Sequence, residues 1–135
     1  MELKDLRDEV KRLFKEIFSS GVPPHIGKLE GATHSIGAAA CPDGTDNVAF
    51  YAIVENDVVE DITYECGNCD PYMFVAADSI VKLSKGKTLD EISKISAEDV
   101  LNFINCPDEI LYNHTTEALK ILKKMLVLDQ QGESR

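Results

Sequence analysis

The sequence predicts an α+β domain in which helices pack on one face of a three-stranded antiparallel sheet. Strand-like runs are confined to residues 34–64, and apolar residues at helical spacing flank them on both sides. The chain has 135 residues and an apolar content of 44%, which is enough hydrophobic material for one core. We therefore expect a single domain over residues 1–135.

The N-terminal segment carries apolar residues at steps of three and four in a charged background. They are Leu3, Leu6, Val10, Leu13, Phe14, Ile17 and Phe18. This spacing predicts an amphipathic helix of about 17 residues within positions 1–20. Serine, glycine and proline residues between Ser19 and Pro24 end it.

The sheet is predicted from the composition of residues 34–64. Small and β-favouring residues from 34 to 54 are interrupted by a polar segment from Pro42 to Asn47, which fits two strands joined by a polar loop. Residues 55–57 have turn chemistry and residues 58–64 resume a strand pattern. The second and third strands therefore form an antiparallel hairpin.

A central helix is predicted to follow the sheet. Asp70-Pro71 is a strong helix start, because aspartate accepts hydrogen bonds from free amides and proline suits the first helical position. Apolar residues from Met73 to Leu83 then form one broad face. The helix is expected to close near Gly86.

Three further helices are predicted after Gly86. Thr88–Glu91 and Ser96–Asp99 each place an acid three residues after a hydroxyl, which is the pattern that opens a helix. Pro107 interrupts the chain, and apolar residues between 118 and 126 mark a final helix before a polar tail over residues 129–135.

Composition excludes several classes of function. The formal net charge of -10, from 24 acidic and 14 basic residues, disfavours nucleic-acid binding, which needs basic surface. No apolar run approaches the roughly 20 residues that cross a bilayer, and the charged N-terminus does not resemble a signal peptide. We therefore expect a cytoplasmic protein, in which four cysteines are more typical of metal ligands or reactive thiols than of disulfides.

Cys66 and Cys69 form the stronger of two candidate sites. Two intervening residues let both sulfurs reach one metal ion or each other. The pair falls where the strand pattern gives way to the helix opened by Asp70-Pro71. The thiol of Cys69 is thus expected just before a helix N-terminus, where the macrodipole favours a reactive or ligating thiolate.

Cys41 and Asp43 form the second candidate site. A thiolate and a carboxylate two residues apart can approach one metal centre, although this pattern by itself is common. The two sites together also fit ordinary loop cysteines beside a structural zinc knuckle. A thioredoxin-like role for Cys66 and Cys69 is disfavoured, because the βαβ context of such motifs is absent.

Residues 36–126 resemble the NifU/IscU family of iron–sulfur scaffold proteins. Ile36-Gly-Ala-Ala-Ala-Cys-Pro-Asp43 is similar to that family's first ligand loop, and Val58-Val-Glu-Asp61 is similar to part of its third strand. Lys85-Gly-Lys-Thr-Leu-Asp-Glu91 is similar to the stretch after its central helix. By this resemblance Cys41, Asp43 and Cys69 take the positions of cluster ligands.

The resemblance implies a SufE/NifU-like fold and a scaffold role rather than an enzymatic one. It implies that the protein receives sulfur from a cysteine desulfurase, assembles a 2Fe–2S cluster and delivers it to apo iron–sulfur proteins. Zn²⁺ is expected in the absence of the cluster, and a homodimer is left open. Two other classes compete: a SufE-type sulfur acceptor without a cluster, and a zinc-stabilised binding module.

Two departures from the family matter. Its third cysteine precedes the last helix, whereas counting back from Ala118 places Leu111 at that position. Cys66, Cys106 and His114 are the candidate replacements in that order, with Cys66 favoured because it lies nearest the main site in the chain. The Leu-Pro-Pro-Val-Lys segment that a dedicated Hsp70-type chaperone recognises is missing, so the resemblance gives no support for that partner.

Overall fold

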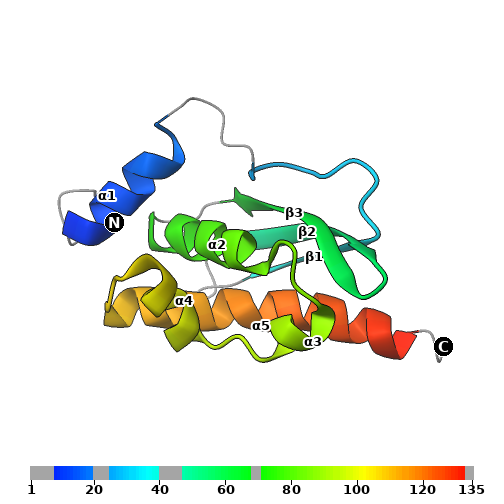
Figure 1. The fold of residues 1–135 in the computed structure, drawn as a ribbon. Coiled ribbons are helices and arrows are strands. Elements are labelled where there is room, and N and C mark those ends of the chain that lie inside the picture. Colours follow the sequence, from blue (N-terminus) through cyan, green and yellow to red (C-terminus); the bar gives the residue numbers. More distant parts are fainter. Residues whose placement is uncertain (1–7, 20–24, 40–46, 68–70, 133–135) are drawn as a thin grey trace.

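The structure, a computed structural model, describes residues 8–19, 25–39, 47–67 and 71–132. Its strands are β1 (His34–Ala39), β2 (Asn47–Glu55) and β3 (Val58–Gly67), and its helices are α1 (Asp8–Ile17), α2 (Pro71–Ser84), α3 (Leu89–Ser93), α4 (Ala97–Ile104) and α5 (Glu109–Gly132). The strands form an antiparallel sheet in the order β1-β2-β3. The predicted α+β fold with a three-stranded antiparallel sheet is confirmed (Figure 1).

The β2–β3 hairpin has the turn that its residues predict. Asn56 and Asp57 both have positive φ, at 53° and 65°, which is the type I′ geometry of tight hairpins. A bulge next to Ile53 then shifts the register. In a regular strand Val59 and Ile62, three positions apart, would point to opposite faces of the sheet. Because of the shift, both side chains are fully buried.

The outer edge of β3 is covered by two segments far apart in the chain. The Tyr64 N–H donates to the His25 carbonyl at 2.9 Å, and Val59 makes the corresponding bond to the Lys87 carbonyl, also at 2.9 Å. Covering an edge strand satisfies its amides and blocks pairing with other chains. It also fixes where β3 lies relative to the chain that follows α2.

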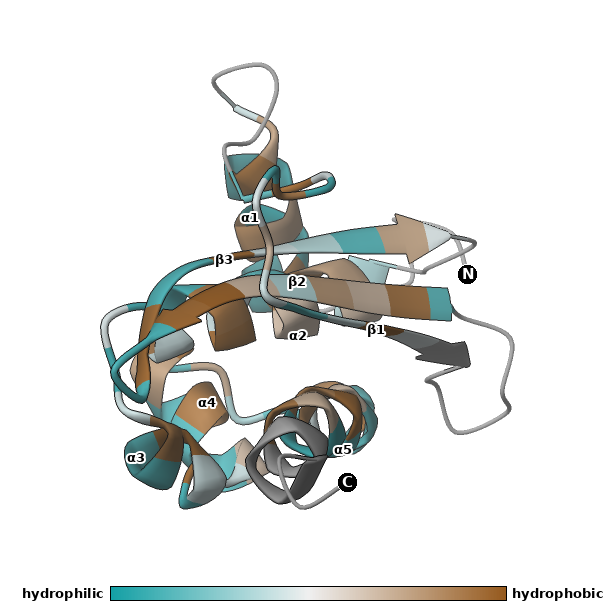
Figure 2. Ribbon diagram, turned by 90° about the vertical axis from the view of Figure 1, so that its right-hand side faces the viewer, coloured by the Kyte–Doolittle hydropathy of each residue, from teal (hydrophilic) through white to brown (hydrophobic). Residues whose placement is uncertain are grey.

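The helices form a second layer on one face of the sheet. Figure 1 shows α2 and α5 running along that face, and Figure 2, in which α5 is seen nearly end-on, shows the sheet and α5 on opposite sides of the hydrophobic interior. The core includes Phe50, Ile62, Ile80, Leu111 and Leu122, all at most 1% exposed. Helix α2 contacts α1, α4, α5 and β3, so it is buried on more sides than the one broad face that the sequence predicts.

Helix α1 packs against the start of α2 through three aromatic rings. Phe14, Phe18 and Phe74 contact one another edge to face, with centroids 5.4 to 5.8 Å apart. Such pairs add about 0.5–1.5 kcal/mol beyond burial. The helix that the sequence predicts is therefore confirmed over Asp8–Ile17, and its first seven positions lie outside the described residues.

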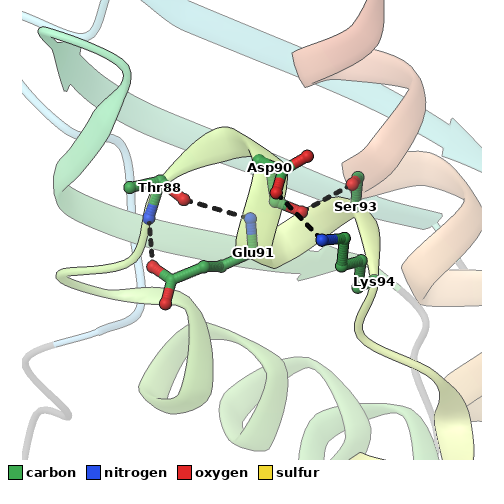
Figure 3. Close-up of polar contacts among 5 residues, drawn as sticks. All are labelled: Thr88, Asp90, Glu91, Ser93 and Lys94. Atoms are coloured by element: carbon green, nitrogen blue, oxygen red, sulfur yellow. Dashed lines mark hydrogen bonds and ion pairs between the residues drawn. The ribbon is translucent and has the colours of Figure 1, made fainter.

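Both predicted capping boxes are present. In α3 the Thr88 hydroxyl accepts from the Glu91 N–H at 3.1 Å, and the Glu91 carboxylate accepts from the Thr88 N–H at 2.9 Å (Figure 3). Ser96 and Asp99 make the same reciprocal pair at the start of α4. These bonds satisfy amides that helices of five and eight residues would otherwise expose.

Two element boundaries differ from the expectation. β3 continues past Tyr64 to Gly67, because its edge and its partner strand supply bonds that local sequence patterns do not reveal. α5 continues to Gly132, past the expected start of the polar tail, because Gln130 and Gln131 are good helix formers. Within the described part of the chain, no helix is long and apolar enough to cross a membrane.

Candidate functional site

The two segments that carry Cys41, Asp43 and Cys69 leave the sheet at one and the same end. The register pairs Ala39 with Asn47, and Asn47 with Gly67, so β1 ends, β2 begins and β3 ends side by side (Figure 1). Residues 40–46 lie between β1 and β2, and residues 68–70 lie between β3 and α2; the three predicted ligands in these segments are outside the described residues. The fold therefore anchors both segments that carry predicted ligands at one end of the sheet.

A shallow hollow of about 470 Å³ lies at this end of the sheet. Its described lining comes from all three strands: Gly37 from β1, Asn47, Val48 and Ala49 from β2, and Glu65, Cys66 and Gly67 from β3. Small residues and glycines keep side chains short there. The hollow is thus continuous with the backbone ends from which the two segments emerge.

Cys66 lies in β3 rather than in the loop where the sequence places it. It is opposite Val48, it has the same strand parity as the buried Tyr64, and it packs against the core while remaining half-buried. A strand sets side-chain direction by parity, so its sulfur belongs to the face that the helices cover. The structure thus brings Cys66 to the candidate site, at the margin of the core.

Helices α2 and α5 both begin at this same end of the sheet (Figure 1). The start of α5 is capped by Asp108, whose Oδ1 accepts from the Leu111 N–H at 2.9 Å. Two helix N-termini direct partial positive charge toward the end of the sheet. That field favours thiolate and carboxylate over their protonated forms.

His114 is held against the first turn of α2. Its ring stacks on the ring of Tyr72, with centroids 5.6 Å apart and planes inclined by 25°. Its Nδ1 is 2.8 Å from the carbonyl oxygen of Ile110, and its side chain is buried, at 6% exposure. The structure therefore brings His114, the last of the three replacement candidates, to the first turn of α2.

Cys106 lies in a different environment. It is 1% exposed and belongs to the core, and its N–H donates to the Leu101 carbonyl at 3.0 Å in the turn that ends α4. Asn105, before it, adopts the left-handed conformation that closes this helix. Its described contacts are those of a core residue at the point where the chain reverses after α4.

Glu65, which lines the hollow, is hydrogen-bonded to a tyrosine on the neighbouring strand. The hydroxyl of Tyr51, in β2, donates to the Glu65 carboxylate in β3 at 2.6 Å. This bond raises the pKa of Tyr51 above its ordinary value, because ionising the phenol would break the bond and place two anions together. The pair links β2 to β3 on the face of the sheet opposite to that of Cys66.

Tyr72 is the site residue that sequence reasoning missed. It is 2% exposed, and no local sequence pattern indicated that α5 would lie against it. Among residues 8–19, 25–39, 47–67 and 71–132, no three histidine, cysteine, aspartate or glutamate side chains are grouped closely enough to hold a metal ion.

Comparison with known proteins identifies relatives by sequence. The model of the NifU-like N-terminal domain matches residues 8–125. Proteins named nitrogen fixation protein NifU, from a Nostoc species and from Trichormus azollae, are each 28% identical over 102 residues. That alignment covers 74% of this chain but 33% of each relative, so the chain spans about a third of their length.

Solved structures share the fold. One, from Fervidobacterium islandicum AW-1, is described as an iron–sulfur cluster assembly scaffold protein for the SUF system; it has a TM-score of 0.65 and 18% identity, covering 90% of this chain and 96% of its own. The N-terminal part of a nitrogen-fixing NifU-like protein from Brucella abortus has a TM-score of 0.61 and 16% identity, covering 95% and 98%. At these identities the similarity is one of fold.

Proposed function

The chain belongs to the NifU-like N-terminal domain family, and on that basis we propose that it is a scaffold for iron–sulfur cluster assembly. The cluster, a 2Fe–2S unit, is built on the protein and passed to apo iron–sulfur proteins, so it is cargo rather than a resident cofactor. The proposal is supported mainly by the position of the two segments that carry the predicted ligands, which leave the sheet at the same end. Residues 40–46 and 68–70 both start from the end of the sheet at which Ala39, Asn47 and Gly67 are in register.

The donor chemistry of these segments fits such a cargo. Cys41 and Cys69 offer the soft thiolates that iron–sulfur clusters require, and the two helix N-termini at this end favour their ionised forms. Asp43 offers a hard carboxylate, which binds iron less firmly than a thiolate does. A site with one weak ligand holds a cluster long enough to build it and releases it more readily.

Sulfur is proposed to come from the persulfide of a cysteine desulfurase. A thiolate of Cys41 or Cys69 attacks the outer sulfur of that persulfide, forming a new S–S bond. The S–S bond of the donor breaks and the desulfurase cysteine leaves as a thiolate, so sulfur moves without net oxidation. The thiolates favoured at this end of the sheet are the nucleophiles that this step needs.

Anaerobic reconstitution with iron and sulfide, followed by visible absorption, tests the proposal. We expect a cluster spectrum for the wild type, loss of it in Cys41→Ala and Cys69→Ala, and transfer of the cluster to an added apo-ferredoxin. Cys106→Ala is the matched control, because its thiol lies in the core, and its cluster should form normally.

Two experimental results would favour one of the competing functions over the scaffold function. Zinc bound at equal stoichiometry, with no capacity for iron and sulfide, would indicate a zinc-stabilised binding module. Sulfur accepted from a desulfurase without any cluster would indicate a SufE-type carrier.

A further inference from the structure

The face of the sheet that is turned away from the helices carries a row of very short side chains near its end. Gly37, Ala49 and Glu65 lie opposite one another across β1, β2 and β3. Ala49 adjoins the buried Phe50 in β2, so this row points to the face opposite the core. All three residues line the hollow of about 470 Å³. Because glycine and alanine offer so little side chain, the floor of the hollow is close to bare backbone.

The hollow also carries an uncompensated negative charge. Of the described residues that line it, Glu65 alone is charged. Its carboxylate accepts from the neutral hydroxyl of Tyr51, which leaves the charge in place. By contrast Asp61, in the same strand, is paired with Lys85 at 3.6 Å. Within the described part of the chain, no ion pair reaches Glu65.

Tyr51 holds the Glu65 carboxylate in one orientation. In the sheet Tyr51 is opposite Thr63, and Glu65 lies two residues further along β3, so the hydrogen bond is a diagonal contact on one face of the sheet. A carboxylate has about four lone-pair positions, and the tyrosine uses one of them. The others remain able to accept. A group that is oriented before its ligand arrives loses little freedom on binding.

From this geometry we propose that the hollow receives an arginine side chain of a partner protein. The guanidinium group is planar, so it can lie flat on the floor formed by Gly37 and Ala49 while its N–H groups donate to Glu65. Arginine fits better than lysine, because its charge is weakly hydrated and its donors form a fork that matches a carboxylate. The inference goes beyond the scaffold function and does not depend on it.

The shape of the hollow and the charge of the chain favour a protein as the source of this arginine. Small-molecule sites bury most of their ligand, whereas this hollow is shallow and open. A protein covers the surrounding sheet as well, and its side chain fills the hollow. The formal net charge of -10 produces a field that attracts a basic partner.

Short peptides test the hollow directly. The probe is acetyl-Gly-Arg-Gly-amide, titrated into the nitrogen-15-labelled full chain while the amide resonances are recorded. We expect saturable shifts at Gly37, Ala49 and Glu65 at millimolar peptide. A peptide with citrulline in place of arginine keeps the shape without the charge and should bind about fivefold more weakly or worse. The corresponding lysine peptide should bind about threefold more weakly.

Two variants remove the floor and the charge separately. Gly37→Val fills the floor, and the strand accommodates it, because a Cβ at Gly37 meets the Cβ of Ala49 at an ordinary 3.6 Å and valine suits a strand. Glu65→Gln removes the charge and keeps the shape. Each should weaken binding of the arginine peptide about fivefold. Glu60→Gln is the matched control, since Glu60 is an exposed acid of β3 about 17 Å away, and its binding should match the wild type.

Three outcomes would overturn the inference. Equal binding of the arginine and citrulline peptides, or unweakened binding by Glu65→Gln, would show that no cation site exists. Equal binding of the lysine peptide would remove the preference for arginine. Shifts confined to residues away from Gly37, Ala49 and Glu65 would mean that net charge alone attracts the peptide. The cluster experiments are read separately, so each proposal can fail while the other stands.

Discussion

Tyr64, in β3, donates a hydrogen bond of 3.2 Å to Oδ1 of Asp78, in α2, and both side chains are buried. Oδ2 of the same carboxylate pairs with Nζ of Lys82 at 2.7 Å. A buried carboxylate needs such partners, because burying an unpaired charge is strongly unfavourable. The contact links α2 to β3, the strand that precedes the segment carrying Cys69. It therefore helps to hold the two elements on either side of that segment in place.

Tyr64→Phe removes one partner of this buried carboxylate. We expect the free energy of unfolding to fall by about 1–3 kcal/mol, the usual penalty for leaving a buried acceptor unsatisfied. Urea denaturation followed by circular dichroism measures it. Tyr51→Phe is the matched control, since Tyr51 bonds Glu65 in a more exposed setting and should change stability by less; equal effects from both would show that the Asp78 contact adds nothing.

Glu91→Gln should weaken the dependence of stability on pH. The hydrogen bond from the Thr88 N–H lowers the pKa of Glu91 below its ordinary value of 4.5. A carboxyl group whose pKa is lower in the folded than in the unfolded state stabilises the fold at pH values above its unfolded pKa. This contribution is lost as the pH falls through its folded pKa. Between about pH 7 and about pH 3, the wild type should therefore lose more stability than Glu91→Gln.

Asp90→Asn is the control for this pH experiment. It removes the same charge from the neighbouring residue, whose ion pair with Lys94 lies in solvent, with side chains 77% and 75% exposed (Figure 3). Exposed pairs of this kind contribute little, so its pH profile should follow the wild type. Denaturant unfolding at each pH gives the comparison, and a Glu91→Gln profile parallel to the wild type would contradict the assignment.

Asp57→Gly should stabilise the hairpin, whereas Asp57→Ala should destabilise it. Asp57 has φ of 65°, a conformation that costs most L-residues roughly 1–2 kcal/mol and glycine almost nothing. Its carbonyl bond from the Leu89 N–H, at 2.8 Å, is retained in both variants. Thermal and urea unfolding should place the variants on opposite sides of the wild type, and a shared sign would mean that backbone strain does not govern this turn.

Asp43→Ala should make the proposed cluster more stable and slower to leave. If the carboxylate is the weak ligand, its loss should slow transfer to an apo-ferredoxin by about tenfold, or about 1.4 kcal/mol in the barrier. Transfer followed by absorbance measures the rate, with Asp46→Ala in the same segment as control. An unchanged rate with an unchanged cluster lifetime would remove Asp43 from the release step.

The sequence predicted secondary structure well where a pattern of three or four residues is enough to form a cap or a turn. The hydroxyl–acid pairs at Thr88 and Ser96 predicted two short helices, and both have the reciprocal caps that such pairs form. Polar turn residues predicted the β2–β3 hairpin. Each of these signals acts over three or four residues and needs no partner from elsewhere.

The candidate site was predictable only in part. Spacing and family resemblance pointed to Cys41, Asp43 and Cys69, and these remain predictions, because they lie outside the described residues. The order of Cys66, Cys106 and His114 rested on chain proximity. The structure packs Cys106 in the core and stacks His114 on Tyr72, which is 42 positions away in the chain, and neither contact could be predicted from chain proximity.

The sequence by itself determined the fold class, the strand and helix order and the family, because periodicity, caps and turns are local and a family motif is linear. The tertiary structure alone decided that β3 carries Cys66 and that Tyr64 bonds Asp78. It alone decided that α5 sets His114 on Tyr72. These contacts depend on how α2 and α5 pack on the sheet, and packing is a balance over the whole core that no short stretch of sequence encodes.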